Sequence, residues 1–214
     1  MNDPCLRSDA ERNRARIVAA ARTVFKRDGL GASMASVARE AAVGIATLFR
    51  RFATKEELVA AVFADRMDAY ADAVAEALKN EDPWQGLVGY IETVCEMQAR
   101  DYGFADVLTM TFPTAKGLEE RRREGYEGIV RLIDRAKAAG SLREDFTPED
   151  LVLVHMANAG VVNATGDAAP ESWRRVVALL VQSFQAPGRG PLPDAPDPKA
   201  VYRAMLRAGQ CRER

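Results

Sequence analysis

The stretch from Val43 to Leu58 constrains the fold of this chain more than any other part of it. It contains a short basic and aromatic helical pattern at 45–52, and Thr54 separates this pattern from a much longer one. A second short pattern at 33–41 precedes it. Helices this short are not stable alone, so both must pack on the helix that the apolar periodicity of 9–27 predicts. Three helices with a tight turn between the second and the third form a helix-turn-helix.

Local signals mark the ends of these helices. Asp28-Gly29 ends the first helix, because glycine readily takes the left-handed conformation at a helix C-terminus. Ser33 is an N-cap for the second helix, and Gly44 is a serviceable cap for the third. Thr54 is followed three residues later by Glu57, which is the spacing of a capping box. The sequence therefore predicts a long helix from Thr54 onward.

The rest of the chain predicts a larger helical body. The helix at 148–164 and the one at 171–185 are apolar over much of their circumference, so each must be covered on more than one side. We predict that this pair contributes to a dimer interface. The charged run Glu119–Arg123 is expected to be exposed near the start of its helix. The expected helices of the body are 54–79, one that begins at Asp82-Pro83, a short one within 101–112, 118–139, 148–164, 171–185 and a short one at 199–208.

The formal net charge of −1 hides an asymmetry along the chain. Residues 1–55 contain eleven Lys or Arg and five Asp or Glu, a charge of +6, whereas the remainder carries −7. A basic N-terminal part on an acidic body indicates that only the first part meets a polyanion. The alternative is a solvated, charged helix surface.

Several classes of protein are disfavoured by composition. Three scattered cysteines are too few for a disulfide framework or a metal site, and one histidine makes a His-based metal site or triad improbable. No paired carboxylates, nucleophile–base pair or phosphate loop stands out, so we expect neither an enzyme nor a cofactor. No apolar run approaches the ~20 residues that span a bilayer, and the N-terminus lacks a signal-peptide core. A cytoplasmic protein without a membrane partner is expected.

The stretch 43–58 resembles the helix-turn-helix signature of the TetR family of bacterial transcriptional regulators. The run at 139–151 also looks like this family's entry to its eighth helix. The residues that carry the resemblance are Val43, Thr47, Leu48, Phe52, Lys55, Glu56 and Leu58, with Thr54 in place of a serine, and upstream Ile17, Ala20, Ala21, Phe25, Gly29, Ser33, Val37, Ala38 and Ala41.

Four positions depart from the family pattern. Ala42 replaces the turn glycine, which costs up to ~1 kcal/mol if the residue keeps a left-handed conformation. Gly44 replaces the serine cap at a cost of a few tenths of a kcal/mol. Phe49 replaces a tyrosine and so lacks its hydroxyl, whereas Arg51 replaces a histidine and adds a permanent charge.

The resemblance implies that the helix at 45–52 binds in the major groove of an operator. Small or apolar residues at its start would approach base edges, and donors around them would contact phosphates. Leu48 and Phe52 are expected in the core. The predicted DNA-binding residues are Ser33, Arg39, Gly44, Ile45, Ala46, Thr47, Phe49, Arg50, Arg51 and Lys55.

The resemblance also implies a small-molecule pocket in the helical body. His155 and Asn158 are the most informative candidates, because they are polar residues on adjacent turns of an apolar helix and buried polar groups need partners. A satisfied core or interface pair is the alternative. The candidate ligand-binding residues are Phe63, Met67, Tyr70, Trp84, Ile91, Cys95, Phe104, Leu108, Met110, Tyr126, His155, Met156 and Asn158.

The expected architecture is all-α. It comprises a helix-turn-helix domain at 1–54, a helical ligand-binding and dimerisation domain at 55–186, and a proline-rich tail at 187–214 with a short terminal helix. The expected function is a homodimeric repressor that binds a pseudo-palindromic double-stranded operator and is released by a mostly apolar effector. Two alternatives remain open: a helical small-molecule-binding protein or enzyme without DNA function, and a DNA-binding dimer without an inducer.

Overall fold

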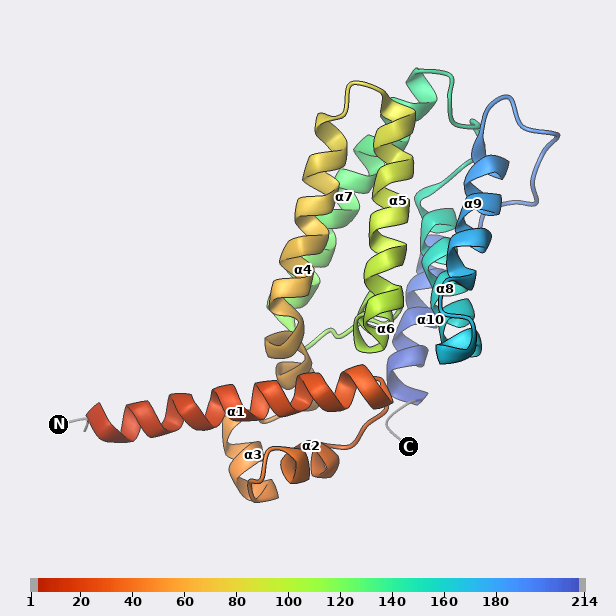
Figure 1. Ribbon diagram of the computed structural model, residues 1–214. Coiled ribbons are helices and arrows are strands. Elements are labelled where there is room, and N and C mark those ends of the chain that lie inside the picture. Colours follow the sequence, from red (N-terminus) through yellow and green to blue (C-terminus); the bar gives the residue numbers. More distant parts are fainter. Residues whose placement is uncertain (1–3, 212–214) are drawn as a thin grey trace.

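The computed structural model describes residues 4–211, and within them the chain forms ten α-helices and one short 3₁₀ helix but no β-strand. Three of the helices form an N-terminal unit that lies across one end of an elongated bundle (Figure 1). The unit contains α1 (Pro4–Asp28), α2 (Met34–Glu40) and α3 (Ile45–Arg51). The bundle contains α4 (Lys55–Lys79), α5 (Pro83–Arg100), α6 (Tyr102–Thr109), α7 (Lys116–Ala138), α8 (Pro148–Thr165) and α9 (Ser172–Phe184), and α10 (Pro198–Cys211) follows it.

These boundaries confirm most of the sequence-based helices to within a few residues. The start of α1 differs, because residues 4–8 are helical whereas the apolar periodicity predicted a helix over 9–27. Gly166 ends α8, and a single antiparallel bridge pairs Leu142 with Gln185. Within residues 4–211, no helix combines the length and hydropathy that crossing a membrane requires.

Side-chain caps hold the beginnings of three helices as the sequence predicts. Ser33 Oγ accepts a hydrogen bond from the backbone amide of Ser36 at 3.1 Å, before α2. Thr54 Oγ1 accepts one from the amide of Glu57 at 3.2 Å, before α4. At the start of α8, the Asp150 carboxylate accepts from the Thr147 amide at 2.7 Å, which completes a capping box.

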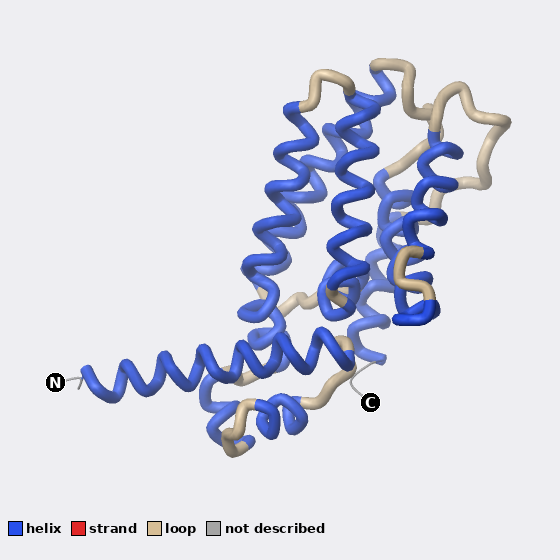
Figure 2. The backbone as a smooth tube through the Cα atoms, viewed as in Figure 1, coloured by secondary structure: helices blue, strands red, loops and turns tan. Residues whose placement is uncertain are grey.

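Close approach at a glycine sets the packing of α7 on α4. A Cβ atom at Gly125 would lie 2.3 Å from Cε1 of Tyr70, so only glycine leaves room for the tyrosine ring. Tyr70 is itself buried, and its ring lies 6.2 Å from that of Tyr90 on α5. Figure 2 shows the loops between α4 and α5 and between α7 and α8 at the end of the bundle that faces away from α1.

Helix α6 joins the N-terminal unit to the bundle. The backbone amide of Leu30, in the loop after α1, donates a buried hydrogen bond of 2.9 Å to Asp106 Oδ2. A Cβ at Gly103 would lie 3.0 Å from the carbonyl oxygen of Phe25, so the first turn of α6 sits directly on the end of α1. The rings of Phe25 and Phe63 lie 6.3 Å apart beside it, which makes the core continuous between the two units.

Candidate nucleic-acid interface and effector pocket

Helix α3 buries one face in the N-terminal unit and exposes the other. Leu48 is fully buried and Phe52, which follows the last residue of α3, is 3% exposed, so both belong to the core as the sequence predicts. On the opposite face, Ile45 is 43% exposed and Phe49 is 47% exposed. Ala46 between them is also exposed. Large apolar side chains exposed together on one short helix indicate a surface that a partner covers.

The turn before α3 is strained at Ala42. This residue has a φ of 50°, whereas L-residues strongly disfavour positive φ. The turn is nevertheless closed, because the amide of Val43 donates to the Ala38 carbonyl at 3.0 Å. Gly44, the N-cap of α3, provides no side-chain hydrogen bond. The seven residues of α3 therefore depend on their burial against α1 and α2 rather than on local capping.

Basic side chains occur on α3 and on the two helices that precede and follow it in the sequence. Arg39 on α2 and Arg51 on α3 are exposed, and neither has a carboxylate within ion-pair distance among the described residues. Arg50 is exposed and its guanidinium donates to Thr47 Oγ1 at 2.9 Å. Lys55 is half-buried at the first position of α4. The predicted DNA-binding residues thus lie on α2, on α3 and at the first position of α4, and Arg39, Arg50 and Arg51 among them are exposed.

Ser33 differs from the other predicted contacts in having its hydroxyl engaged. Its Oγ accepts from the Ser36 amide and lies 3.0 Å from Ser36 Oγ. The serine is exposed at the N-terminus of α2, where the helix dipole favours an anion.

A cavity of about 340 Å³ lies among α4, α6, α7, α8 and α10. Four of the candidate ligand-binding residues line it: Tyr70, Leu108, Tyr126 and His155. A larger groove of about 650 Å³ runs between α4 and α5, but it is a surface groove edged by Asp72, Glu76 and Lys79. We take the cavity of 340 Å³ as the candidate pocket, because its walls are mainly apolar and come from five helices.

The other nine candidates do not line this pocket. Phe63, Met67, Ile91, Cys95, Phe104 and Met110 are buried in the core, and Trp84 and Met156 are half-buried. Asn158 is 1% exposed, and its amide nitrogen donates to the Cys95 carbonyl at 3.2 Å and to Gln98 Oε1 at 2.9 Å. Asn158 therefore joins α8 to α5.

His155 presents a neutral imidazole to the pocket. The side chain is buried, and burial lowers the pKa of His155 to about 4, so the ring carries no charge near neutral pH. Its Nδ1 lies 4.0 Å from Cys95 Sγ, and burial raises the pKa of that thiol to about 12. Nε2 has no hydrogen-bond partner among the described residues. Two buried nitrogens of residues that line the pocket therefore lack a hydrogen-bond partner among the described residues, His155 Nε2 and Arg122 Nε.

Arg122 is a charged group in the pocket wall whose charge is compensated. Its guanidinium donates to the carbonyls of Val107 and Leu108, at 2.6 and 3.2 Å, at the end of α6. Glu119 lies 3.3 Å from Arg122 Nε, and burial lowers the pKa of Arg122. The prediction that the whole run Glu119–Arg123 is exposed is wrong for these two half-buried residues, because the carbonyls at the end of α6 accept hydrogen bonds from Nη1 and Nη2 of the arginine.

Comparison with known families covers both parts of this architecture. Residues 17–62 match the family described as bacterial regulatory proteins, tetR family. Residues 82–185 match the C-terminal domain of SbtR-like transcriptional regulators. The chain belongs to the TetR family. Proteins of this family are transcriptional regulators with a DNA-binding helix-turn-helix, and they are not enzymes.

Solved TetR-family structures share the fold. A TetR-family regulator from Shewanella sp. PV-4 is 23% identical over 81% of this chain and 98% of that one, with a TM-score of 0.54. The ketosteroid regulator KstR2 of Mycobacterium tuberculosis is 17% identical over 80% and 94% of the two chains, with a TM-score of 0.56. FadR from Bacillus subtilis, solved with stearoyl-CoA, is 17% identical over 78% and 97%, with a TM-score of 0.52. Comparison with curated proteins gives no significant match.

The sequence did not predict two features of the site in this TetR-family chain. The guanidinium of Arg14 lies over the ring of Phe52 at 5.2 Å, which brings a cation of α1 beside the end of α3. Arg14 lies three residues before the buried Ile17, and this spacing puts the two side chains on the same side of α1. The second feature is α10, which follows the SbtR-like region and supplies part of the pocket wall.

Proposed function

We propose that this chain is a homodimeric, effector-responsive TetR-family repressor. The observation that supports this most directly is the position of α6. Within eight residues it carries Asp106, which bonds to the N-terminal unit, and Leu108, which lines the pocket. A compound that shifts α6 from within the pocket would therefore shift the helix-turn-helix relative to the bundle.

In the proposed complex, α3 lies in the major groove with Ile45, Ala46 and Thr47 toward the base edges. Ala46 permits close approach, and the exposed Ile45 provides an apolar contact for a thymine methyl. Phosphate contacts come from Arg39, Arg50, Arg51, Lys55 and Ser33, together with the backbone at the N-cap Gly44. Phe49, which lacks a hydroxyl, contributes apolar contact only.

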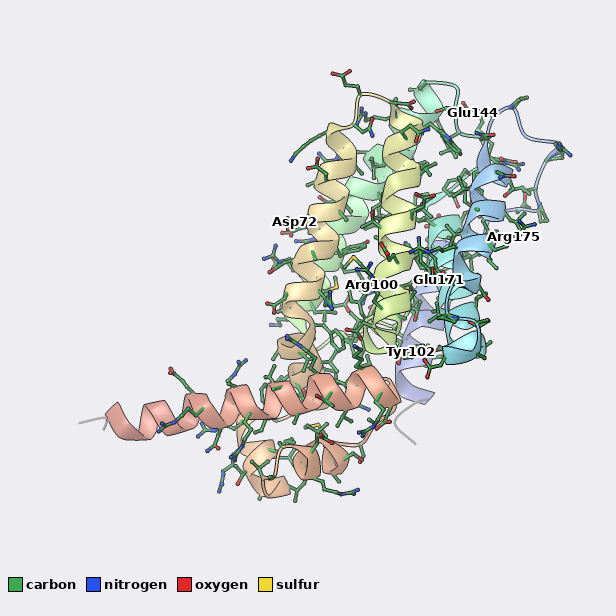
Figure 3. All side chains as sticks on the ribbon, in the orientation of Figure 1. Asp72, Arg100, Tyr102, Glu144, Glu171 and Arg175 are labelled. Atoms are coloured by element: carbon green, nitrogen blue, oxygen red, sulfur yellow. The ribbon has the colours of Figure 1, made fainter. Side chains whose placement is uncertain are left out.

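The proposed dimer interface is formed by α8 and α9. Leu153 on α8 is 43% exposed and Leu179 on α9 is 54% exposed, so each helix presents a large apolar side chain to solvent. Gly160 on α8 has open space where a Cβ would lie, which permits close approach of a second helix. Figure 3 shows charged side chains such as Asp72 and Arg175 extending from the outer sides of α4 and α9. To bind successive half-sites, the two copies of α3 in such a dimer need to lie ~34–36 Å apart.

The proposed effector is a mostly apolar compound with a polar group that bonds to His155 Nε2. The volume of about 340 Å³ and the apolar side chains of Leu108, Ile129 and Leu151 support this class of ligand. FadR, which has the same fold, was solved with stearoyl-CoA, a ligand with a long apolar chain. Of the two polar residues singled out on α8, the structure supports His155 for this role rather than Asn158, whose amide serves the α5–α8 contact.

The proposal is tested by gel shift with DNA upstream of the gene that encodes this chain. A helical enzyme or sequestration protein would leave the DNA unshifted, which would refute the proposal. A compound screen for release of the shifted DNA then separates an effector-responsive regulator from a DNA-binding dimer without an inducer. Sedimentation of the protein and of a Leu179→Glu variant tests the interface, because a carboxylate at its centre should favour the monomer, whereas Asp72→Ala on α4 should not.

A further inference from the structure

Helix α10 is amphipathic, and its apolar side closes the pocket. Val201 and Met205 are each 8% exposed, although they belong to a helix outside the bundle. Together with Tyr202 they form part of the pocket wall opposite α7 and α8. Arg203 and Ala204 lie on the exposed side of the same helix. The spacing of Val201 and Met205, one helical turn apart, is what places both on one face.

The hydrogen bonds described for α10 lie within the helix and its N-terminal cap. The Asp197 carboxylate accepts from the amide of Lys199 at 3.1 Å and lies 3.9 Å from the guanidinium of Arg203. In the described part of the chain, no hydrogen bond or ion pair of residues 198–208 reaches α7 or α8. The segment before α10 is held at Gly190, whose carbonyl accepts a hydrogen bond of 2.8 Å from Arg143. The docking of α10 therefore depends on a few apolar side chains.

A helix of this length is marginal in water without tertiary packing. If α10 leaves the bundle, Val201 and Met205 become exposed and the pocket loses one wall. A ligand in the pocket would add apolar contact on the inner face of α10 and would strengthen its docking. Ligand binding and the docking of α10 are then linked equilibria, and each must favour the other.

We propose that α10 is a ligand-binding wall of the effector pocket, which docks around a neutral, mostly apolar compound held against Val201, Tyr202 and Met205. This inference rests on the proposed effector-responsive function. Neutrality follows from the pocket's own charges, which cancel. Arg122 is paired with Glu119 and with two carbonyls of α6, and the lining contains one further cation, Arg123, and one further carboxylate, Glu149. Of the two unpartnered nitrogens, Arg122 Nε lies 3.3 Å from the Glu119 carboxylate, which leaves His155 Nε2 for the single hydrogen-bonding group of the ligand.

The test uses two dyes with the same aromatic skeleton and the full-length protein. N-phenyl-1-naphthylamine is neutral with one N–H, and 8-anilinonaphthalene-1-sulfonate adds a sulfonate. The neutral dye should bind saturably at one site per chain, and the anionic dye at least ten-fold more weakly. Equal or tighter binding of the anionic dye, or no saturable binding of the neutral one, would overturn the assigned ligand class.

Amide hydrogen exchange then tests the linkage to α10. If the neutral dye binds only the docked form, its presence at ten times Kd should slow exchange of residues 199–208 by about 11-fold, the factor 1 + [L]/Kd. Amides of α9, which does not line the pocket, serve as the internal control and should change much less. Unchanged exchange in α10 at saturating dye would show that α10 is not part of the site.

Two matched substitutions on α10 complete the test. Val201→Asp puts a carboxylate on the pocket face, and Ala204→Asp puts the same group on the solvent face. Val201→Asp should weaken binding of the neutral dye at least ten-fold and Ala204→Asp less than two-fold, while Ala204→Asp should shift DNA like the parent protein. Equal dye affinities would overturn the role of α10. If the parent protein does not shift the DNA, the proposed function is contradicted instead. The failure of the α10 inference and the failure of the proposed function are therefore distinguishable.

Discussion

The backbone amide of Leu30 donates a 2.9 Å hydrogen bond to Asp106 Oδ2, and this buried contact fixes the loop after α1 to the middle of α6. Asp106 is 3% exposed, so its carboxylate is held inside the joint between the two units. The contact spans 76 residues of sequence, and it is a direct polar link between the helix-turn-helix and the pocket-bearing bundle.

Asp106→Ala should lower the free energy of unfolding by about 1–3 kcal/mol, because the Leu30 amide would lose its buried acceptor. Asp106→Asn keeps an acceptor oxygen and should cost less. Urea unfolding of both variants measures the difference. Equal stability of the two variants would show that the Asp106 carboxylate does not stabilise the fold through its hydrogen bond with the Leu30 amide.

The stability of the protein should fall between pH 7 and pH 5 because of His155. The pKa of this residue is about 4 in the folded chain, below its ordinary value of 6.5, so the unfolded chain binds the proton more readily. The stability is therefore complete above pH 6.5 and decreases as the pH falls toward 4. The expected loss at pH 5 is about 2 kcal/mol. Because the chain has one histidine, His155→Gln should remove this loss, and urea unfolding at both pH values measures it.

Gly125→Ala should destabilise the fold by about 1–3 kcal/mol, because the new Cβ would displace the Tyr70 ring. The matched control is Gly117→Ala on the same helix, where a Cβ meets nothing within 4 Å. That substitution should be neutral or stabilising, since alanine favours a helix over glycine. Thermal unfolding of both variants is the measurement, and equal melting temperatures would contradict the close packing of α7 on α4.

Ala42→Gly should stabilise the protein by about 1 kcal/mol, because glycine adopts the positive φ at this turn without the strain of a Cβ. Ala75→Gly, at an exposed position within α4, is the control and should cost about 1 kcal/mol. Chemical unfolding of the two variants should therefore move in opposite directions. A loss of stability in both would mean that residue 42 is not held in the left-handed region.

Arg51→Ala should weaken binding to all DNA sequences alike and reduce the slope of log Kd against log salt by about one unit for each protomer. Lys79→Ala, at the end of α4 that lies away from α3, removes the same charge and should leave the slope unchanged. Titrations at several salt concentrations measure both. An unchanged slope for Arg51→Ala would remove this residue from the phosphate contacts.

The helix boundaries were predictable because their signals are local. Ser33, Thr54 and Thr147 each cap the helix that follows them within three residues, so the sequence alone places these starts. The left-handed turn at Ala42 was also foreseeable from the resemblance, and the observed φ agrees with it. These features depend on a few neighbouring residues rather than on the packing of distant helices.

The pocket was less predictable because its wall combines side chains from five helices. Leu108 and Phe104 look alike in the sequence, yet only Leu108 reaches the pocket while Phe104 lies in the core. Arg122 stands in a charged run that is typical of a surface, and only the carbonyls at the end of α6 explain its burial. Val201 and Met205 follow a proline-rich segment that is typical of extended chain, so the sequence indicated only a short terminal helix and no packing of its apolar face.

The shortness of α6 has a consequence for how movement passes from the pocket to the helix-turn-helix. Asp106 and Leu108 are two residues apart, about 3 Å along the helix axis. A helix of eight residues closed by its own hydrogen bonds has little room to bend between these two points. A displacement of Leu108 therefore moves Asp106 with it as part of one rigid body, because no flexible segment lies between them. The size of the response to an effector should then be set by how much more tightly the compound binds when Leu108 is displaced than when it is not.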